Sequence, residues 1–399
     1  MIHNFSINKY IDSPYLCDMS NIYLDFNSTS PVDPQVLEQM LPWFTEKFGN
    51  AASKTHHFGW EADAAVTHAR EKVASLIGAE PNEIIFTSGA TEAINLALRG
   101  VMDAYSDKGN HLIVCSTEHK AVLDTAVALT ATGKKISYLP VNRDGRIDLD
   151  ELKKAIQKET VLVAVMMGNN ETGVIQDVEA ISRICNENRI IFFSDLTQAA
   201  GKVNINVREL GISIACISAH KFYGPKGIGA LYISRKNPRV IVTPQITGGG
   251  HEKGLRSGTL NVPGIVGMGA AAELAQLEIW DYAMHTSKLR TKLEQGIEEL
   301  GNIRINGSTR FRLPNTTNLQ IGGVRADKLI KDLHDIAISS GSACSSALIE
   351  PSHVLIAMGL TEQESYSCIR LSLGKTTTDD EINYVIEKIN SLVEKIRKQ

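Results

Sequence analysis

Residues 214–233 read IACISAHKFYGPKGIGALYI: an apolar run, a lysine, a turn rich in glycine and proline, and a second apolar run. Similar apolar runs lie upstream at residues 111–117, 161–167 and 190–195, and stretches of helical pattern follow the first two. Strands that are apolar throughout are typical of a mainly parallel sheet with helices on both faces. The alternation of strands and helices therefore predicts an α/β fold.

The pattern changes after about residue 265. A long helical stretch, 265–300, is followed by strand-like segments near 303–306 and 315–321 and by a terminal helix that begins at Asp379. Acidic residues at the start of that helix and basic residues at its end suit the helix dipole. We predict a large α/β domain that comprises residues 30–278. A smaller α+β domain would comprise residues 1–29 together with residues 279–399.

The composition is that of an ordinary globular protein, with 43% hydrophobic residues, 22% charged residues and a net charge of -4. This balance gives no reason to expect a nucleic-acid or membrane partner. The six cysteines include no C-x-x-C pair, so we expect mostly reduced thiols in a cytoplasmic protein. The N-terminus resembles neither a signal nor a transit peptide, and no run approaches the roughly 20 apolar residues of a membrane span.

Residues 84–98, IIFTSGATEAINLAL, predict a strand, a turn and a helix start. The first N–H groups of a helix have no partner within the helix and bind phosphate well. Ala90 and Thr91 stand at this start, and the Thr91 hydroxyl can add a further donor. The simpler alternative is an ordinary strand-to-helix turn with an N-cap.

Two strand ends carry polar groups that suit a pyridoxal-phosphate (PLP) site. Asp195 ends the run 190–195, where an acid could keep a pyridine ring nitrogen protonated. Gln198 lies close enough in sequence to reach the ring's phenolic oxygen. Lys221 follows the run 214–220 and is a candidate Schiff-base amine. The alternatives are a helix N-cap for Asp195 and a solvated surface side chain for Lys221.

The spacing of these residues supports one shared site. Asp195 and Lys221 are 26 residues apart (221 − 195), which leaves room for one crossover between adjacent parallel strands. Ser218 and His220 flank Lys221 and could bind the same phosphate as the helix start.

Cys344 and Arg370 lie far downstream of this set. Cys344 stands in SSGSACSS, where small polar neighbours offer little apolar bulk to bury it, so an exposed and reactive thiol is predicted. Arg370, in YSCIRLSLG, suits a substrate carboxylate, although a structural ion pair is an equally good interpretation.

From Tyr23 to Gly374 the chain resembles the cysteine desulfurases of PLP fold type I, specifically the iron–sulfur-assembly type with a long catalytic-cysteine loop. The matching stretches are FGNAASKTHHFGWEA, TSGATEAINLA, STEHKAVLD, NNETGV, DLTQAAGK, SAHKFYGPKGIGALY, GGGHEKGLRSGTLNVP and SSGSACSS. The resemblance implies a PLP-dependent enzyme that converts L-cysteine to L-alanine and transfers the sulfur as a persulfide.

The resemblance also implies a role for each matched residue. Lys221 would bind PLP covalently, Asp195 would pair with the pyridine nitrogen, and Gln198 would contact the phenolic oxygen. His119 would stack on the ring and move protons. The remaining assignments are Ala90, Thr91, Ser218 and His220 for the phosphate, Thr259 for the phosphate of a partner subunit, Asn170 and Arg370 for the substrate carboxylate, and Cys344 for the nucleophile.

A Thr259 that contacts the phosphate of a partner subunit implies a homodimer. A persulfide on Cys344 implies proteins that accept the sulfur. The stretch 345–351 after Cys344 is predicted to form a loop that moves between the cofactor and an acceptor. An iron–sulfur scaffold is one such acceptor, with Cys344 as a shared ligand of the nascent cluster; tRNA thiolation is another pathway. The alternatives are a selenocysteine lyase, an aminotransferase-like enzyme, a desulfurase dedicated to DNA sulfur modification, and a non-enzymatic scaffold.

Overall fold

The computed structural model describes residues 21–340 and 350–398. Its largest sheet has the strand order β2-β8-β7-β6-β5-β3-β4. The strands are β2 (Ile84–Thr87), β8 (Gly229–Ile233), β7 (Ile214–Ser218), β6 (Ile191–Asp195), β5 (Thr160–Ala164), β3 (His111–Cys115) and β4 (Lys135–Leu139). The α/β fold with a mainly parallel sheet is confirmed, because the five strands from β7 to β4 pair in parallel.

Strand β8 runs antiparallel to both of its neighbours, β2 and β7. Only residues 219–228 separate the end of β7 from the start of β8. This connection is shorter than the crossover of a dozen or more residues that a parallel neighbour needs. The turn in GPKGIG therefore sends the chain straight back along β7, and the end of β2 lies at the same edge of the sheet as the ends of β6 and β7.

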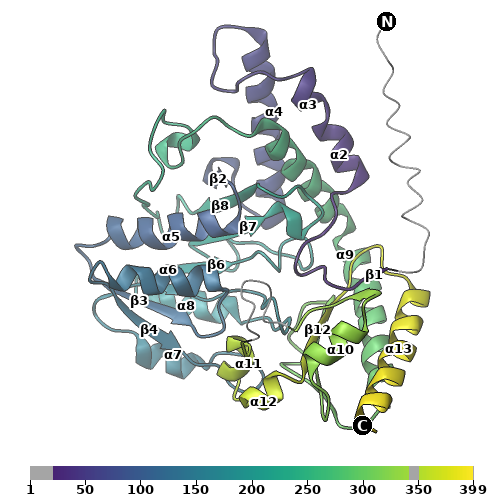
Figure 1. Ribbon diagram of the computed structural model, residues 1–399. Helices are drawn as coiled ribbons and strands as arrows, with labels where there is room; N and C mark the ends of the chain where they lie inside the picture. The colour runs from purple at the N-terminus through teal and green to yellow at the C-terminus, as the bar shows by residue number, and fades with distance from the viewer. Residues whose placement is uncertain (1–20, 341–349, 399) are drawn as a thin grey trace, which may run out of the picture.

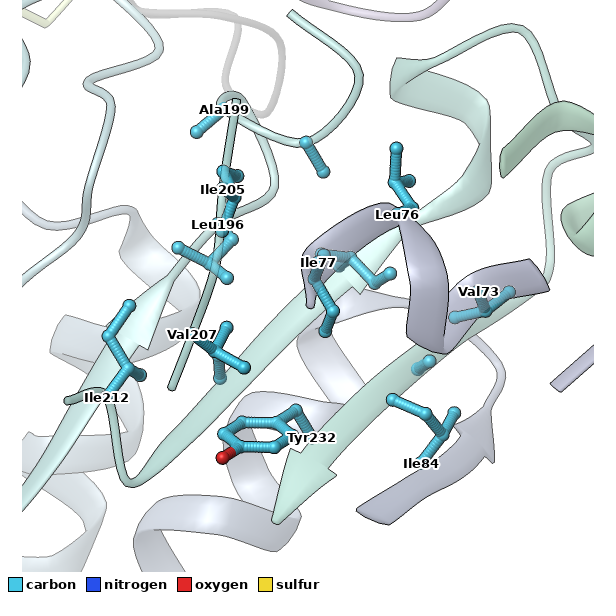
Figure 2. Packing of buried hydrophobic residues seen from close by; sticks show 14 of the residues in the cluster. Val73, Leu76, Ile77, Ile84, Leu196, Ala199, Ile205, Val207, Ile212 and Tyr232 are labelled. Carbon is cyan, nitrogen blue, oxygen red and sulfur yellow. The ribbon is translucent and has the colours of Figure 1, made fainter. Parts of the chain in front are cut away.

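Helices cover both faces of the sheet (Figure 1). One face packs on α5 (Ala90–Ala104) and α6 (Lys120–Thr130). The other packs on α4 (His57–Ile77), α7 (Leu149–Ala155), α8 (Val178–Glu187) and α9 (Val262–Glu298). Successive residues of β2, β3, β7 and β8 alternate between the two clusters, as the period of two in a strand requires. Figure 2 shows the second face, where Val73 and Ile77 of α4 lie near Ile84 and Tyr232.

A separate hydrophobic cluster lies around β12, α10 and α13, away from the large sheet (Figure 1). It contains a three-stranded antiparallel sheet of order β12-β10-β9 and a parallel pair, β1 with β11. These elements are β12 (Cys368–Ser372), β10 (Thr316–Ile321), β9 (Ile303–Ile305), β1 (Ile22–Tyr23), β11 (Ile336–Ala337), α10 (Ala326–Asp332) and α13 (Asp379–Arg397). The two predicted domain boundaries stay predictions. Residue 278 lies inside α9, and this helix contributes residues both to a cluster of the large sheet and to the separate cluster.

The remaining elements are short. They are α2 (Pro34–Met40), α3 (Pro42–Thr45), α11 (His353–Ala357), α12 (Glu362–Ser365) and the 3-10 turns η2 (Pro81–Glu83), η3 (Ala219–Lys221) and η4 (Glu252–Gly254). Among the helices described, none combines the length and the apolar character that crossing a membrane requires.

Candidate active site

A pocket of about 610 Å³ lies where the strands of the large sheet end and where the loop after β1 and strand β12 reach it. Ligands of open α/β sheets bind at this edge, beyond the carboxyl ends of the strands. Ten of the predicted site residues line the pocket: Ala90, Thr91, His119, Asn170, Asp195, Gln198, Ser218, His220, Lys221 and Arg370. Residues that are up to 280 positions apart (370 − 90) are thus brought together.

Asp195 ends β6, and its side chain is buried. Its Oδ1 accepts hydrogen bonds from Thr197 N–H at 2.8 Å and from the Cys216 thiol at 3.3 Å. Burial, together with the nearby Asp195 charge, raises the pKa of Cys216 well above its usual range, so the thiol keeps its proton and donates. Among the described residues no donor reaches Oδ2, which leaves this oxygen for a protonated ring nitrogen.

Lys221 lies in η3, directly after β7. Its Nζ donates to the main-chain oxygens of Asn27 and Ser28, both at 2.6 Å. Burial, and then the Arg370 charge, lowers the pKa of this amine to about 8. A substantial fraction is therefore neutral and nucleophilic near neutral pH, unlike a solvated surface lysine.

The start of α5 forms one wall of the pocket. Gly89 precedes it, and a Cβ on Gly229 would lie only 2.7 Å from Gly89 Cα, so this close approach to β8 requires glycine. A Cβ on Gly89 would lie 3.8 Å from Ser218 Oγ, which places that hydroxyl beside the helix start. The N–H groups of Ala90 and Thr91 have no acceptor within the helix, so this corner offers an anion several donors.

Two histidines reach the pocket without a charge at neutral pH. His119 is the N-cap of α6, and its Nδ1 accepts Ala121 N–H at 3.1 Å, which leaves the ring proton on Nε2. Burial lowers the pKa of His119. Burial, with the charge of Lys221, lowers the pKa of His220 to about 4, and its Nδ1 lies 3.1 Å from Thr29 Oγ1.

For Arg370 the sequence left two interpretations open, a structural ion pair and binding of a substrate carboxylate, and the structure is compatible with both. Its Nη2 forms an ion pair with Asp25 Oδ1 at 2.5 Å, and its Nη1 donates to Asn170 O at 3.1 Å. Its Nε and the side-chain oxygen of Asn170 are buried without a hydrogen-bond partner among the described residues. Because buried polar atoms are rarely left unpaired, the Arg370 N–H suits an acceptor such as a substrate carboxylate, whereas the Asn170 oxygen suits a donor such as a substrate N–H.

The sequence analysis missed two residues that surround Lys221. Asn27 follows β1, far from any predicted motif, and its main-chain oxygen accepts from both Lys221 and Gln198. Lys202 is buried and donates to Asn27 Oδ1 and Gln198 Oε1. The signal for Lys202 was its place four residues after Gln198 in DLTQAAGK.

Two predicted residues are not at this pocket. Thr259 is exposed and does not line the pocket of its own chain, so a role in a partner subunit stays a prediction. Cys344 and most of the predicted loop, residues 345–349, lie outside the described residues. Within the described ranges no cluster of three or more histidine, cysteine or acidic side chains could hold a metal ion.

Residues 22–385 match the family model for class-V aminotransferases, and the chain belongs to this family of PLP-dependent enzymes. Within the family it is similar to proteins named cysteine desulfurase IscS. The one from Anaeromyxobacter dehalogenans is 50% identical over 378 residues, which cover 94% of this chain and 93% of the relative.

Similar solved structures agree with this family assignment. A NifS-like protein superposes with a TM-score of 0.88 at 40% identity, covering 94% of this chain and 99% of the other. SspA in complex with cysteine superposes with a TM-score of 0.79 at 36% identity, covering 90% of this chain and all (100%) of that one.

The pocket fits the cofactor of this family. A primary amine at Lys221, a carboxylate oxygen without a donor at Asp195 and a helix start with free N–H groups are the three groups that PLP needs. Arg370 and Asn170 line the same pocket, and the Arg370 guanidinium suits the carboxylate of a substrate bound beside PLP.

Proposed function

We propose that this chain is a cysteine desulfurase that converts L-cysteine to L-alanine and takes the sulfur onto Cys344 as a persulfide. The observation that carries the proposal is the single pocket that Lys221, Asp195, Asn170 and Arg370 line together. The 50% identity to cysteine desulfurases over nearly the whole chain supports the choice of substrate within the family.

When bound, PLP supplies an electron sink for the carbanion that forms at the substrate α-carbon. Asp195 Oδ2 would hold a proton on the ring nitrogen, which keeps that sink effective. Gln198 would donate from Nε2 to the phenolic oxygen, and the start of α5 with Ser218 and His220 would hold the phosphate. These contacts fix the cofactor without using Lys221.

Lys221 and His119 are the groups that can move protons. With its pKa lowered to about 8, the Lys221 amine would take the α-proton of the bound substrate near neutral pH. His119 carries its ring proton on Nε2 and could exchange it with the substrate. Arg370 would orient the substrate by its carboxylate, so that the α-proton points to these bases.

Cys344 completes the reaction as a thiolate. Its sulfur attacks the substrate sulfur, a new S–S bond forms as the substrate C–S bond breaks, and the electron pair of that bond stays with the carbon skeleton, which leaves as alanine after protonation. The persulfide then passes to an acceptor cysteine on a partner protein. An iron–sulfur scaffold is the acceptor that we propose, with Cys344 as a shared cluster ligand in the assembly.

Two variants and one control variant test this function. The purified wild type should be yellow, form alanine from L-cysteine and carry a persulfide that mass spectrometry detects. Lys221→Ala should lose the covalent cofactor and the activity. Cys344→Ala should stay yellow but form no persulfide, whereas Cys185→Ala, a buried cysteine in α8, should behave as wild type.

Two outcomes would contradict the proposal. A wild-type protein that stays colourless after incubation with PLP would overturn the cofactor assignment and with it the whole function. Full sulfide release by Cys344→Ala would remove Cys344 as the acceptor and would favour a lyase that acts on selenocysteine.

A further inference from the structure

Lys202 is a buried lysine that the mechanism above does not use. It is 2% exposed, and no acidic side chain lies within ion-pair distance of it among residues 21–340 and 350–398. Its Nζ instead donates to two amide oxygens, Gln198 Oε1 at 2.7 Å and Asn27 Oδ1 at 3.1 Å. A buried amine without a carboxylate is costly, which calls for an explanation beyond packing.

Its two acceptors surround the cofactor lysine. Gln198 Nε2 donates to the main-chain oxygen of Asn27 at 2.8 Å, and the same oxygen accepts from Lys221 Nζ at 2.6 Å. Because a main-chain oxygen only accepts, the Gln198 nitrogen must face Asn27 and the Gln198 oxygen must face Lys202. An amide nitrogen carries two hydrogens, so one N–H of Gln198, which lines the pocket, remains for a ligand.

We propose that Lys202 is a positioning residue that fixes and polarises the Gln198 amide, so that the free Nε2–H donates to the phenolic oxygen of the bound cofactor. The inference rests on the proposed PLP site and adds a group behind it. A donor on the amide oxygen strengthens the donation from the amide nitrogen, because linked hydrogen bonds polarise one another.

Removing Lys202 should act mainly on Gln198. Asn27 Oδ1 keeps a second donor, Asn315 Nδ2, at 3.2 Å, whereas Gln198 Oε1 has Lys202 as its one donor among the described residues. Burial, followed by the charges of Lys221 and Arg370, lowers the pKa of Lys202 well below its usual range. The side chain has N–H groups to donate in either protonation state, so its effect on Gln198 does not depend on its charge.

The test follows the colour of the PLP protein as a function of pH. A donor to the phenolic oxygen favours the unprotonated form of the Lys221–PLP link, so losing the donor raises the midpoint of the absorbance titration. Gln198→Ala should raise it by about one pH unit, the equivalent of one hydrogen bond to a charged group. Lys202→Met should raise it by less, and the double variant should match Gln198→Ala alone.

Other titrating or charged groups at the pocket stay the same in every variant and cancel in this comparison; they are Asp25, Glu92, His119, Asp195, His220, Lys221, Lys226 and Arg370. Lys202→Gln, which keeps one amide donor, should lie between wild type and Lys202→Met. Urea unfolding of the cofactor-free variants measures any loss of stability separately.

Each outcome of the titration supports or overturns the proposed role of Lys202. A Lys202→Met midpoint equal to wild type, or a shift that adds in full to that of Gln198→Ala, would overturn the inference. Failure of both Lys202 variants to fold would assign the residue a structural role and would overturn it too. A wild-type protein without any visible band would instead contradict the proposed PLP site itself.

Discussion

Burial sets the protonation of the basic side chains at the pocket. The pKa of Lys221 is lowered to about 8 and that of His220 to about 4, and His119 shifts in the same direction. Desolvation is the largest cause in all three, because a buried site disfavours the charged form of a base. Near neutral pH the two histidines are therefore neutral, and Lys221 has a larger neutral fraction than a solvated lysine.

The pKa of Lys221 predicts the pH dependence of cofactor binding. The neutral amine is the form that reacts with PLP, so the rate of covalent binding to cofactor-free protein should rise with pH and reach half of its maximum near pH 8. For an unperturbed lysine the half-maximal rate would come only near about pH 10.4. Stopped-flow absorbance measures the rate, and borohydride reduction followed by mass spectrometry should locate the label on Lys221.

A rate that keeps rising beyond pH 10 would contradict the buried environment of this amine. Lys221→Ala is the control, and it should take up no covalent label at any pH.

Replacing Arg370 separates substrate binding from cofactor binding. Arg370→Lys keeps the charge near Asp25 but loses the planar fork, so kcat/KM for L-cysteine should fall about 10- to 100-fold, the loss of one charged hydrogen bond. The visible band of bound PLP should not change. Arg397→Lys, which alters an equally fork-like set of contacts at the far end of α13, should leave kcat/KM at the wild-type value.

An unchanged kcat/KM in Arg370→Lys would reduce Arg370 to a structural ion pair with Asp25.

At the scale of elements, the site depends on how closely α5 approaches the sheet. The backbone of Gly229 in β8 touches that of Gly89 and Ile217 O, with 2.7 Å from a notional Gly229 Cβ to each. Real Cβ atoms cannot come this close, so any side chain here must push α5 away. The phosphate donors of Ala90 and Thr91 would move with the helix.

Gly229→Ala should therefore weaken PLP binding more than its effect on folding explains. We expect a destabilisation of roughly 1–3 kcal/mol, as for other overpacked sites, and at least a tenfold weaker affinity for PLP. Ile389→Val, a core change in α13 of roughly 1 kcal/mol, is the control of comparable stability and should bind PLP as wild type does.

Fluorescence titration with PLP and urea unfolding measure the two quantities. An affinity loss in Gly229→Ala no larger than in Ile389→Val would show that the approach of α5 to β8 does not shape the phosphate site.

At the scale of the whole molecule, the pocket is lined by residues from the large sheet and by residues from the part of the chain around the three-stranded sheet. Asp195 and Lys221 follow strands of the large sheet, whereas Asn27 and Arg370 belong to the loop after β1 and to β12. Helix α9 packs on both clusters and joins them without a break. A chain of this design brings the cofactor lysine and the substrate arginine together only when both parts have folded.

The proposed role of Thr259 predicts complementation between subunits. Mixing Lys221→Ala with Thr259→Ala chains under conditions that exchange subunits should restore activity, because one site of the mixed dimer then has the lysine from one chain and the threonine from the other. Each variant alone should be less active than the mixture, and light scattering should give the mass of two chains.

No gain on mixing, or a fully active monomer, would contradict the homodimer and the shared phosphate site. Mixing Lys221→Ala with Arg370→Lys serves as the control, because both residues line the same pocket of one chain and no intact site can form.

The sequence by itself determined the α/β class, the mainly parallel sheet and ten of the residues that line the pocket. Apolar runs require strands that are buried on both faces, and Asp195 and Lys221 follow two such runs one crossover apart. These features depend on neighbours along the chain, which a sequence shows directly. The motif around Lys221 even contains the reason for the antiparallel β8, since a ten-residue connection (228 − 219 + 1) is too short for a crossover to a parallel strand.

Only the tertiary structure decided which groups act on these residues from elsewhere in the chain. The ion pair of Arg370 with Asp25 joins positions 345 apart, and Asn27 reaches Lys221 over 194. The contact of Gly229 with Gly89 and the buried place of Lys202 likewise leave no local pattern. The pKa of Lys221 follows from the same cause, because burial and the charge of Arg370 exist only once distant segments have packed around the amine.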